Sequence, residues 1–219
     1  MKNAADLLKR RTFLTKSIAM SALSLGSANL WANSPNVNPE KSLFVIGPVD
    51  GYTPQVGTLV SMLNYNRQTI IDSVKKLSIA EIDFLLDAKS NSIAGLVMHL
   101  GAVEKFYQIN TFEGRQEFNA EEKKVWNSAM NLGDEGRNNI KGKEIGHYLN
   151  QLAEVRQKTL ELLKTKDDKW LLAVDPEWSK ERDLNTYWKW FHVCEHESNH
   201  RGQIAFLKGR LPGAKPGRD

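Results

Sequence analysis

The long apolar stretch SIAGLVMHLGAVEKFYQINTF, from Ser92 to Phe112, restricts the fold more than any other part of the chain. On a helix with about 3.6 residues per turn, its apolar side chains cover most of the circumference instead of one stripe. The polar cluster from Lys89 to Ser92 marks where the helix begins. A helix of this kind needs apolar partners on several sides, so we expect it near the centre of a helical domain.

Another helix is predicted upstream, where Thr53 offers an N-cap and Pro54 occupies the first helical position. The apolar residues that follow recur mostly at helical spacing and form one stripe. They are Leu59, Met62, Leu63, Ile70, Val74 and Leu77, which extends the predicted helix to Leu77.

Two more long helices complete the predicted set. One is amphipathic and runs from Glu144 to Leu163, and the last begins near the cap Asn185 and ends at Gly209. A shorter helix is expected around Glu121 to Met130, and no alternating strand pattern of useful length appears. The sequence therefore predicts an all-α protein: a four-helix bundle over residues 51–213 with an extra short helix in a connection, followed by a tail at 214–219.

The first 32 residues have the layout of an export signal: a charged start, a weakly apolar run and a polar end. The tract KRRTFLTK, from Lys9 to Lys16, resembles a twin-arginine signal. We expect export to the periplasm or beyond, with cleavage after Ala32 or, alternatively, after Ala28, and a linker at 33–50. An ordinary secretory signal or an uncleaved anchor is the alternative. The apolar run is too short for a convincing membrane span, so no stable span is expected after cleavage.

The charge of the chain is concentrated in this leader. Residues 1–32 carry five basic side chains against Asp6, which accounts for the whole formal net charge of +4. The remainder is neutral, so composition gives no reason to expect nucleic-acid binding. Cys194 is the single cysteine, which excludes an intramolecular disulfide in an oxidising compartment.

Three histidines, His192, His196 and His200, follow one another at four-residue intervals on the last predicted helix. Residues four apart lie about 40° from each other around the axis and roughly 6 Å apart, so His196 and His200 can direct imidazoles at one point. His192 and His200 are about 12 Å apart, which is too far to share an ion. The pair His192 and His196 remains a geometrically allowed alternative.

A third nitrogen has to come from another helix, and His99 lies on the central apolar one. Gly95 and Ala102 on the same face are small enough to leave room for an ion, water and substrate. Three neutral imidazoles with an open fourth position suit a divalent metal, with Zn²⁺ first and Ni²⁺, Fe²⁺ or Mn²⁺ as alternatives. Otherwise His99 is a core histidine bonded to a nearby acceptor, and the His196 and His200 pair lies on an exposed face.

Residues near the histidines also receive expected roles. Metal-bound imidazoles donate their other N–H to an acceptor, for which Glu195 and Asn199 are candidates. Glu195 and Glu197 are expected on a solvated or inter-helix surface, and Glu104 in a structural ion pair. Cys194 lies about 200° round the helix from His196 and is expected to be a small buried apolar residue.

Two motifs resemble those of a known superfamily. The segment HESNHRGQIAFLKGRLPG resembles the HxxxHRGQI segment of DinB/YfiT-like putative metal-dependent four-helix-bundle proteins, and SIAGLVMHLGAVEKFY resembles the second-helix segment with its single histidine. GYTPQVGTLVSMLNYNRQTI is similar to the first helix of one DinB branch, so the resemblance runs from about Gly51 to Gly213. It implies His99, His196 and His200 as the metal ligands and leaves His192 at the cavity rim or beside the ligands.

The resemblance also implies a range of activities on small molecules. Members resemble metal-dependent thiol transferases that use bacillithiol, mycothiol or glutathione, a mycothiol-dependent isomerase, and a hydrolase. Because low-molecular-weight thiols are chiefly cytoplasmic and this chain carries an export-like leader, we expect metal-assisted hydrolysis first, with water in the open position. Thiol S-transfer and a non-catalytic metal-binding module are the alternatives. Bundles of this kind also often pair, so a homodimer is expected as an option.

Overall fold

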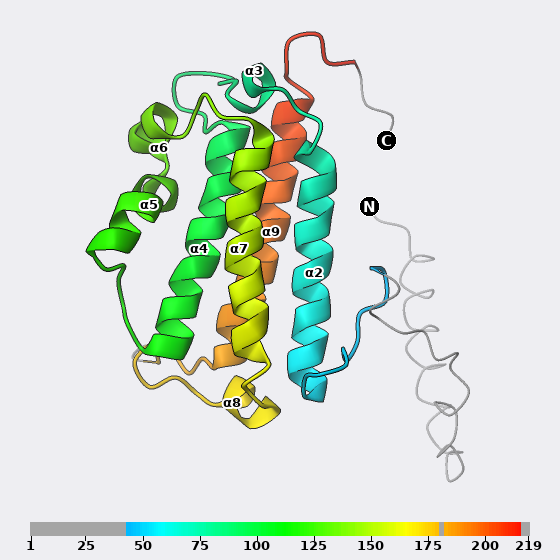
Figure 1. Cartoon of the computed structure of the whole chain (residues 1–219), viewed down its shortest axis with the longest axis vertical. Coiled ribbons are helices and arrows are strands. Elements are labelled where there is room, and N and C mark those ends of the chain that lie inside the picture. Colours follow the sequence, from blue (N-terminus) through cyan, green and yellow to red (C-terminus); the bar gives the residue numbers. More distant parts are fainter. Residues whose placement is uncertain (1–42, 180–181, 216–219) are drawn as a thin grey trace, which may run out of the picture. The chain divides into compact units, whose positions relative to one another are not determined.

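In the computed structural model, which describes residues 43–179 and 182–215, helix α4 (Ile93–Glu113) is buried along most of its length. The Ser92 hydroxyl accepts a hydrogen bond from the Gly95 amide at 3.0 Å and caps the first turn. Gly114 ends the helix in the left-handed conformation, with φ of 69°. Helix α4 packs against α5, α7 and α9, which confirms the central position expected from its apolar circumference (Figure 1).

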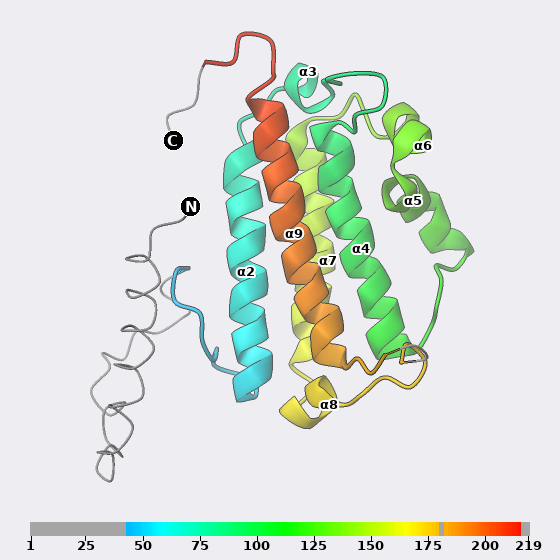
Figure 2. The same ribbon diagram turned by 180° about the vertical axis from the view of Figure 1, so that it is seen from behind.

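Three other long helices complete a four-helix bundle: α2 (Pro54–Val74), α7 (Ile145–Leu163) and α9 (Thr186–Lys208). Helix α2 contacts α7 and α9, and α4 also contacts α7 and α9, so the four form a closed ring of neighbours (Figures 1 and 2). Asn185 caps α9 by accepting from the Trp188 amide at 2.9 Å, and Gly209 follows its last residue, as predicted. The all-α fold class is therefore confirmed.

The predicted start of α2 is confirmed in its position, but the side chain predicted to cap the helix is wrong. Thr53 occupies the N-cap, but its side chain makes no cap hydrogen bond. The carboxylate of Asp168 performs that function, accepting from the Gln55 amide at 3.0 Å and the Val56 amide at 3.2 Å. The predicted end is also wrong, because the helix ends at Val74 and Leu77 packs against the core from the following turn.

The connections contain four short helices, of which the sequence predicted one. Helix α5 (Ala120–Asn131) matches the expected short helix and begins with a capping box between Asn119 and Glu122. Helices α3 (Ile79–Ile82), α6 (Gly133–Asn139) and α8 (Asp168–Leu172) were not predicted. They are too short for a periodic apolar pattern to develop.

Helices α5 and α7 approach α4 closely at Gly101. A Cβ atom on Gly101 would lie 3.1 Å from Trp126 Cζ3 and 3.2 Å from Leu152 Cδ1. Trp126 belongs to α5 and Leu152 to α7, so this position of α4 has to be glycine for both neighbours to keep their distance.

The apolar run that begins at Leu43 lies along α2 without joining a sheet. The Gly47 amide donates to Ser61 Oγ at 3.1 Å, and a Cβ on Gly57 would lie 2.5 Å from the backbone nitrogen of Val49. The predicted signal peptide at 1–32, the linker as far as residue 42 and most of the tail lie outside the described residues. Within the described ranges, no helix has the length and apolar character needed to cross a membrane.

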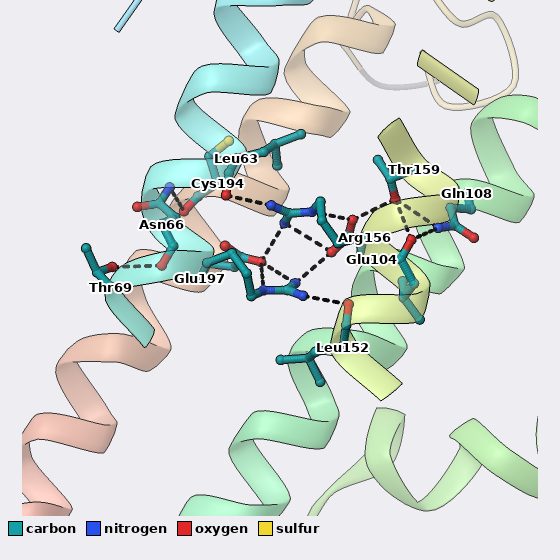
Figure 3. Close-up of polar contacts among 12 residues, drawn as sticks. Leu63, Asn66, Thr69, Glu104, Gln108, Leu152, Arg156, Thr159, Cys194 and Glu197 are labelled. Carbon is teal, nitrogen blue, oxygen red and sulfur yellow. Dashed lines mark hydrogen bonds and ion pairs between the residues drawn. The ribbon is translucent and has the colours of Figure 1, made fainter. Parts of the chain in front are cut away.

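Four charged side chains, one from each long helix, meet inside the bundle (Figure 3). We call these four side chains the buried ion quartet. Its members are Arg67 of α2, Glu104 of α4, Arg156 of α7 and Glu197 of α9. Arg67 donates to Glu197 Oε1 at 3.0 Å and to Glu104 Oε2 at 2.6 Å. Arg156 donates to Glu104 Oε1 at 2.8 Å and to Glu197 Oε1 at 2.9 Å. The formal charges cancel, which permits all four side chains to be buried together.

The quartet confirms the ion pair expected for Glu104. Of the two surfaces expected for Glu197, solvated or inter-helix, the structure shows the inter-helix one, because Glu197 is 1% exposed between helices. Burial alone raises the pKa of Glu104, but the charges of Arg156 and Arg67 outweigh it, with hydrogen bonds from Arg156 and Thr159, and lower that pKa to about 2. Both carboxylates are thus engaged in holding the bundle together.

Candidate metal centre

The three histidines proposed as ligands converge between α4 and α9. His99 comes from α4, and His196 and His200 come from successive turns of α9. His196 Nε2 lies 3.0 Å from His99 Nε2 and 3.0 Å from His200 Nε2, and one ring nitrogen of each residue lies within 4.8 Å of the others. Residues almost a hundred positions apart in the sequence therefore present nitrogen atoms to one point.

The backbone of α5 sets the orientation of His99. His99 Nδ1 lies 2.8 Å from the carbonyl oxygen of Ala129, near the end of α5. A carbonyl only accepts, so Nδ1 carries the proton and donates it there. The Nε2 atom of His99 therefore directs a lone pair toward His196 and His200.

A side-chain relay along α9 does the same for His200. Its Nδ1 lies 3.1 Å from Gln203 Oε1, and Gln203 Nε2 donates to Asn199 Oδ1 at 3.1 Å. With the amide in this orientation, His200 Nδ1 is the donor and Nε2 faces the centre as a lone pair. Asn199, a candidate acceptor from the sequence, acts one step further away. Gln203 was missed, although its place three residues after His200 in HRGQI was a usable signal.

His192 lies outside the cluster, as the superfamily resemblance implies. Its Nδ1 lies 2.7 Å from Glu195 Oε1, and its ring stacks on Trp188 with 5.5 Å between centroids. The His192 and His196 rings have centroids 5.6 Å apart. His192 thus occupies the rim beside His196, and Glu195 serves His192 and not a member of the cluster.

Burial lowers the pKa of all three clustered imidazoles. The effect is largest for His196, where burial and then the neighbouring His200, His99 and His192 rings lower the pKa to about 3. The hydrogen bonds that His99 donates to Ala129 and His200 donates to Gln203 oppose this lowering of the pKa. The three rings are therefore neutral at physiological pH, which is the form that ligates metals.

The donor set fits a divalent cation of the zinc type. A tetrahedral ion with Zn–N bonds of about 2.0–2.1 Å places its nitrogen ligands roughly 3.3 Å apart, close to the 3.0 Å spacings here. The Nε2 atoms of His99 and His200 both direct lone pairs at His196 Nε2, which carries one proton at most. At least one of the two short nitrogen–nitrogen contacts therefore has no hydrogen bond, and a bound cation would remove the repulsion between its lone pairs. No carboxylate or thiol joins this group in the described residues, so the histidine, cysteine and acidic side chains there supply three ligands and not four.

Cys194 takes no part in the cluster. It is 5% exposed and packs in the apolar core formed with Trp190 and Val193, as expected from its helical position. Burial and the nearby charge of Glu197 raise the pKa of its thiol to about 12, so it remains protonated.

Comparisons with known proteins agree with this geometry. The family model of the mycothiol-S-transferases matches residues 58–213, a range that contains all three clustered histidines. A conserved protein from Enterococcus faecalis with a crystal structure shares the fold, with 16% sequence identity and a TM-score of 0.53 over 69% of this chain and 93% of that one. Comparison with curated proteins gave no match. Because the family match covers well over half of the chain, the chain belongs to the mycothiol-S-transferase family, one of the DinB-like families of helical bundles.

Proposed function

We propose that the protein is a metal-dependent S-transferase that joins a small thiol to an electrophilic substrate. The observation that carries this proposal is the cluster of His99, His196 and His200, which supplies three neutral ligands and leaves one tetrahedral position for an exchangeable ligand. The family match supports the reaction class. We assign Zn²⁺ as the first candidate ion, with Ni²⁺, Fe²⁺ and Mn²⁺ as alternatives.

A divalent cation held by the three histidines would supply the acidity that a thiol needs, because a coordinating thiol is deprotonated outright. In the transfer, the sulfur forms a bond to the electrophilic carbon, the leaving group departs with the bonding electron pair, and the thiol proton passes to solvent. His99 and His200 are already held with their Nε2 lone pairs inward by Ala129 and Gln203. Neither of these two imidazoles therefore has to rotate or lose a proton before a metal binds.

Hydrolysis, the first expectation from the sequence, receives less support. A carboxylate near the metal commonly acts as general base for water, but no carboxylate joins the histidine cluster in the described residues. Glu104 and Glu197 are bound by arginines, and Glu195 by His192. A thiol has an ordinary pKa of about 8.5 against about 15.7 for water, so it needs much less help to ionise. Hydrolysis stays an untested prediction.

A purely structural metal site is also less well supported. Structural zinc sites use four protein ligands, whereas three converge here among the described residues. The export-like leader, in turn, stays a proposal, and it bears on the choice of thiol because an exported enzyme needs a thiol available outside the cytoplasm. The thiol has to be identified by experiment.

The proposal is tested with tag-free protein loaded with Zn²⁺, a panel of small thiols and a benzyl halide as electrophile. We expect a thioether product by mass spectrometry and loss of that product in His196→Ala. His147→Ala is the matched control, because His147 is exposed and bonded to Gln151 on α7. Two results contradict the proposal: thioether formation at the same rate with and without metal, or no thioether formation above the uncatalysed rate with any of the thiols.

A further inference from the structure

A cavity of about 540 Å³ lies beside the side chains that orient His200, since Asn199 and Gln203 are among its lining residues. Leu86 to Asn91, in the connection before α4, contributes four lining residues on one side, and the last turns of α9 line the other. Leu96 of α4 also lines it, three residues before His99 and so on a neighbouring face of the helix. Both helices that carry the histidines therefore contribute to this cavity.

Gln203 connects the cavity to the histidines. Its side chain lines the cavity, and its Oε1 accepts the Nδ1 proton of His200 at 3.1 Å. Nδ1 and the inward-facing Nε2 are the two nitrogens of the same His200 imidazole ring, so the Gln203 amide bonds the ring on the side opposite the cluster. Asn199, bonded to Gln203, lines the same wall. A molecule in the cavity thus rests against the relay that orients a proposed ligand.

The lining is apolar with neutral hydrogen-bonding groups. Two of its apolar side chains are unusually exposed for their type, Phe206 at 53% and Leu86 at 39%. Asp87 is the one charged lining residue, and its Oδ1 accepts from the amides of Lys89 and Ser90 at 2.8 Å each. Among the described residues that line this cavity, none is basic, and the guanidinium of Arg210 lies over the Phe206 ring, 4.9 Å from its centroid. An anionic ligand would therefore lose water there without a basic lining side chain to offset the loss.

A smaller cavity of about 250 Å³, lined by residues of α5 and α7, has the opposite character. Its lining includes Lys124, Lys141, Lys143 and His147 and no acidic residue. The two cavities thus differ in charge, and the one that includes Asp87 and no basic residue among its described lining is the one in contact with the histidine relay.

We propose that the cavity beside His200 binds the body of the electrophilic substrate and selects molecules that carry no negative charge. The apolar part lies against Phe206 and Leu86, and a polar group bonds to the amides of Asn199 and Gln203. Gly202 makes this wall open, because nothing lies within 4 Å of a Cβ placed there. That the bound molecule is a substrate rests on the proposed function. That an uncharged molecule binds in this cavity does not depend on the proposed function.

Binding is tested on the full chain loaded with Zn²⁺ by titration with 2-naphthamide and, separately, 2-naphthoate, which differ in charge. The side-chain amide NMR signals of Asn199 and Gln203 report on this cavity, and that of Gln151 reports on the basic one. We expect 2-naphthamide to shift Asn199 and Gln203 and to bind at least about tenfold more tightly than 2-naphthoate at that site. Equal or tighter binding of 2-naphthoate there, shifts of Gln151 alone, or no shift with either compound overturns the proposal.

Gly202→Leu fills the cavity from a position where the helix tolerates a side chain. Its control is Gly146→Leu, because Gly146 is also an exposed helical glycine with open space around a Cβ and lies outside both cavities. We expect both variants to keep their helicity and one Zn²⁺ per chain, and Gly202→Leu alone to lose the 2-naphthamide shifts. Loss of binding in both variants, or in neither, contradicts the assignment.

The substrate role is tested by comparing 4-(chloromethyl)benzamide with 4-(chloromethyl)benzoate in thiol transfer, with chloride as the leaving group. We expect kcat/KM to favour the amide by at least about tenfold, and Gly202→Leu to abolish most of that preference. If neither compound reacts while 2-naphthamide still binds, the proposed function fails and the cavity assignment stands. If both react equally well, the selectivity fails and the S-transferase proposal stands.

Discussion

Arg156 Nε lies 2.8 Å from Glu104 Oε1 in the interior of the bundle, where the Glu104 side chain is completely inaccessible to solvent. We expect Glu104→Gln to lower the free energy of unfolding by about 3–5 kcal/mol, because it leaves two buried guanidinium groups with one carboxylate. Urea denaturation followed by circular dichroism measures this. Glu121→Gln is the control, since its pair with Lys124 is exposed and worth about 0.5 kcal/mol or less. Equal losses in the two variants would show that burial of the quartet is not what matters.

The same pair makes stability depend on pH in the acid range. The folded pKa of Glu104 is about 2, below its ordinary value of 4.5. The carboxylate therefore stabilises the fold fully above about pH 4.5, and this stabilisation, about 3 kcal/mol, is lost progressively as pH falls toward 2. Urea midpoints measured between pH 7 and pH 3 should fall for the natural chain and fall less steeply for Glu104→Gln. Parallel pH profiles for the two proteins would contradict the assignment.

Removal of one imidazole should abolish metal binding without unfolding the bundle. We expect tag-free protein to hold about one Zn²⁺ per chain and His99→Ala to hold almost none, because two remaining nitrogens from α9 make a weak site. Elemental analysis after dialysis measures this, with His147→Ala as the control. Chelation should also lower the melting temperature of the natural chain and leave that of His99→Ala unchanged. Full metal content in His99→Ala would remove His99 from the ligand set.

Two helical glycines should respond in opposite directions to alanine. Gly101→Ala places a methyl group 3.1 Å from Trp126 and should destabilise the fold by about 1–3 kcal/mol. Gly202→Ala meets nothing within 4 Å on an exposed helical face and should stabilise it by about 0.5–1 kcal/mol. Thermal and urea unfolding of the two variants tests this, and a change of the same sign in both would contradict it.

We propose that the tract KRRTFLTK is a twin-arginine signal, in which case export depends on its two arginines. We expect replacement of Arg10 and Arg11 by lysine to retain the protein in the cytoplasm in a folded, metal-loaded state, because the twin-arginine route requires the arginine pair. Fractionation followed by immunoblotting measures this. Export that persists in the double variant and stops when the general secretory route is blocked would identify an ordinary signal peptide.

The long helices were predictable because their signals are local and redundant. Helix α4 was predicted from its apolar composition. Helix α9 was predicted from the N-cap residue Asn185 and from Gly209, which follows its last residue. The three clustered histidines followed from helical spacing combined with the superfamily motifs. Helices α3 and α8 escaped prediction because four or five residues carry no periodicity, and they depend on caps such as Ser78 and Asp167.

Apart from the histidine cluster, the contacts between distant segments described above were not predicted from the sequence. Glu197 looks like an ordinary surface residue until Arg67 and Arg156 are brought beside it from α2 and α7. In the same way, nothing in the sequence around Ala129 distinguishes it as the acceptor for His99. Such assignments depend on tertiary packing, which a single sequence does not express.

The carbonyl group that holds His99 has a consequence for mutational tolerance. Every residue has a carbonyl oxygen, so a substitution at position 129 that preserves the helix leaves this acceptor in place. A screen of random variants should therefore find the side chain at this position freely exchangeable with other small residues. Single-residue insertions and deletions within α5 should instead be among the most damaging changes, since each one rotates the last turn and carries the carbonyl away from the imidazole.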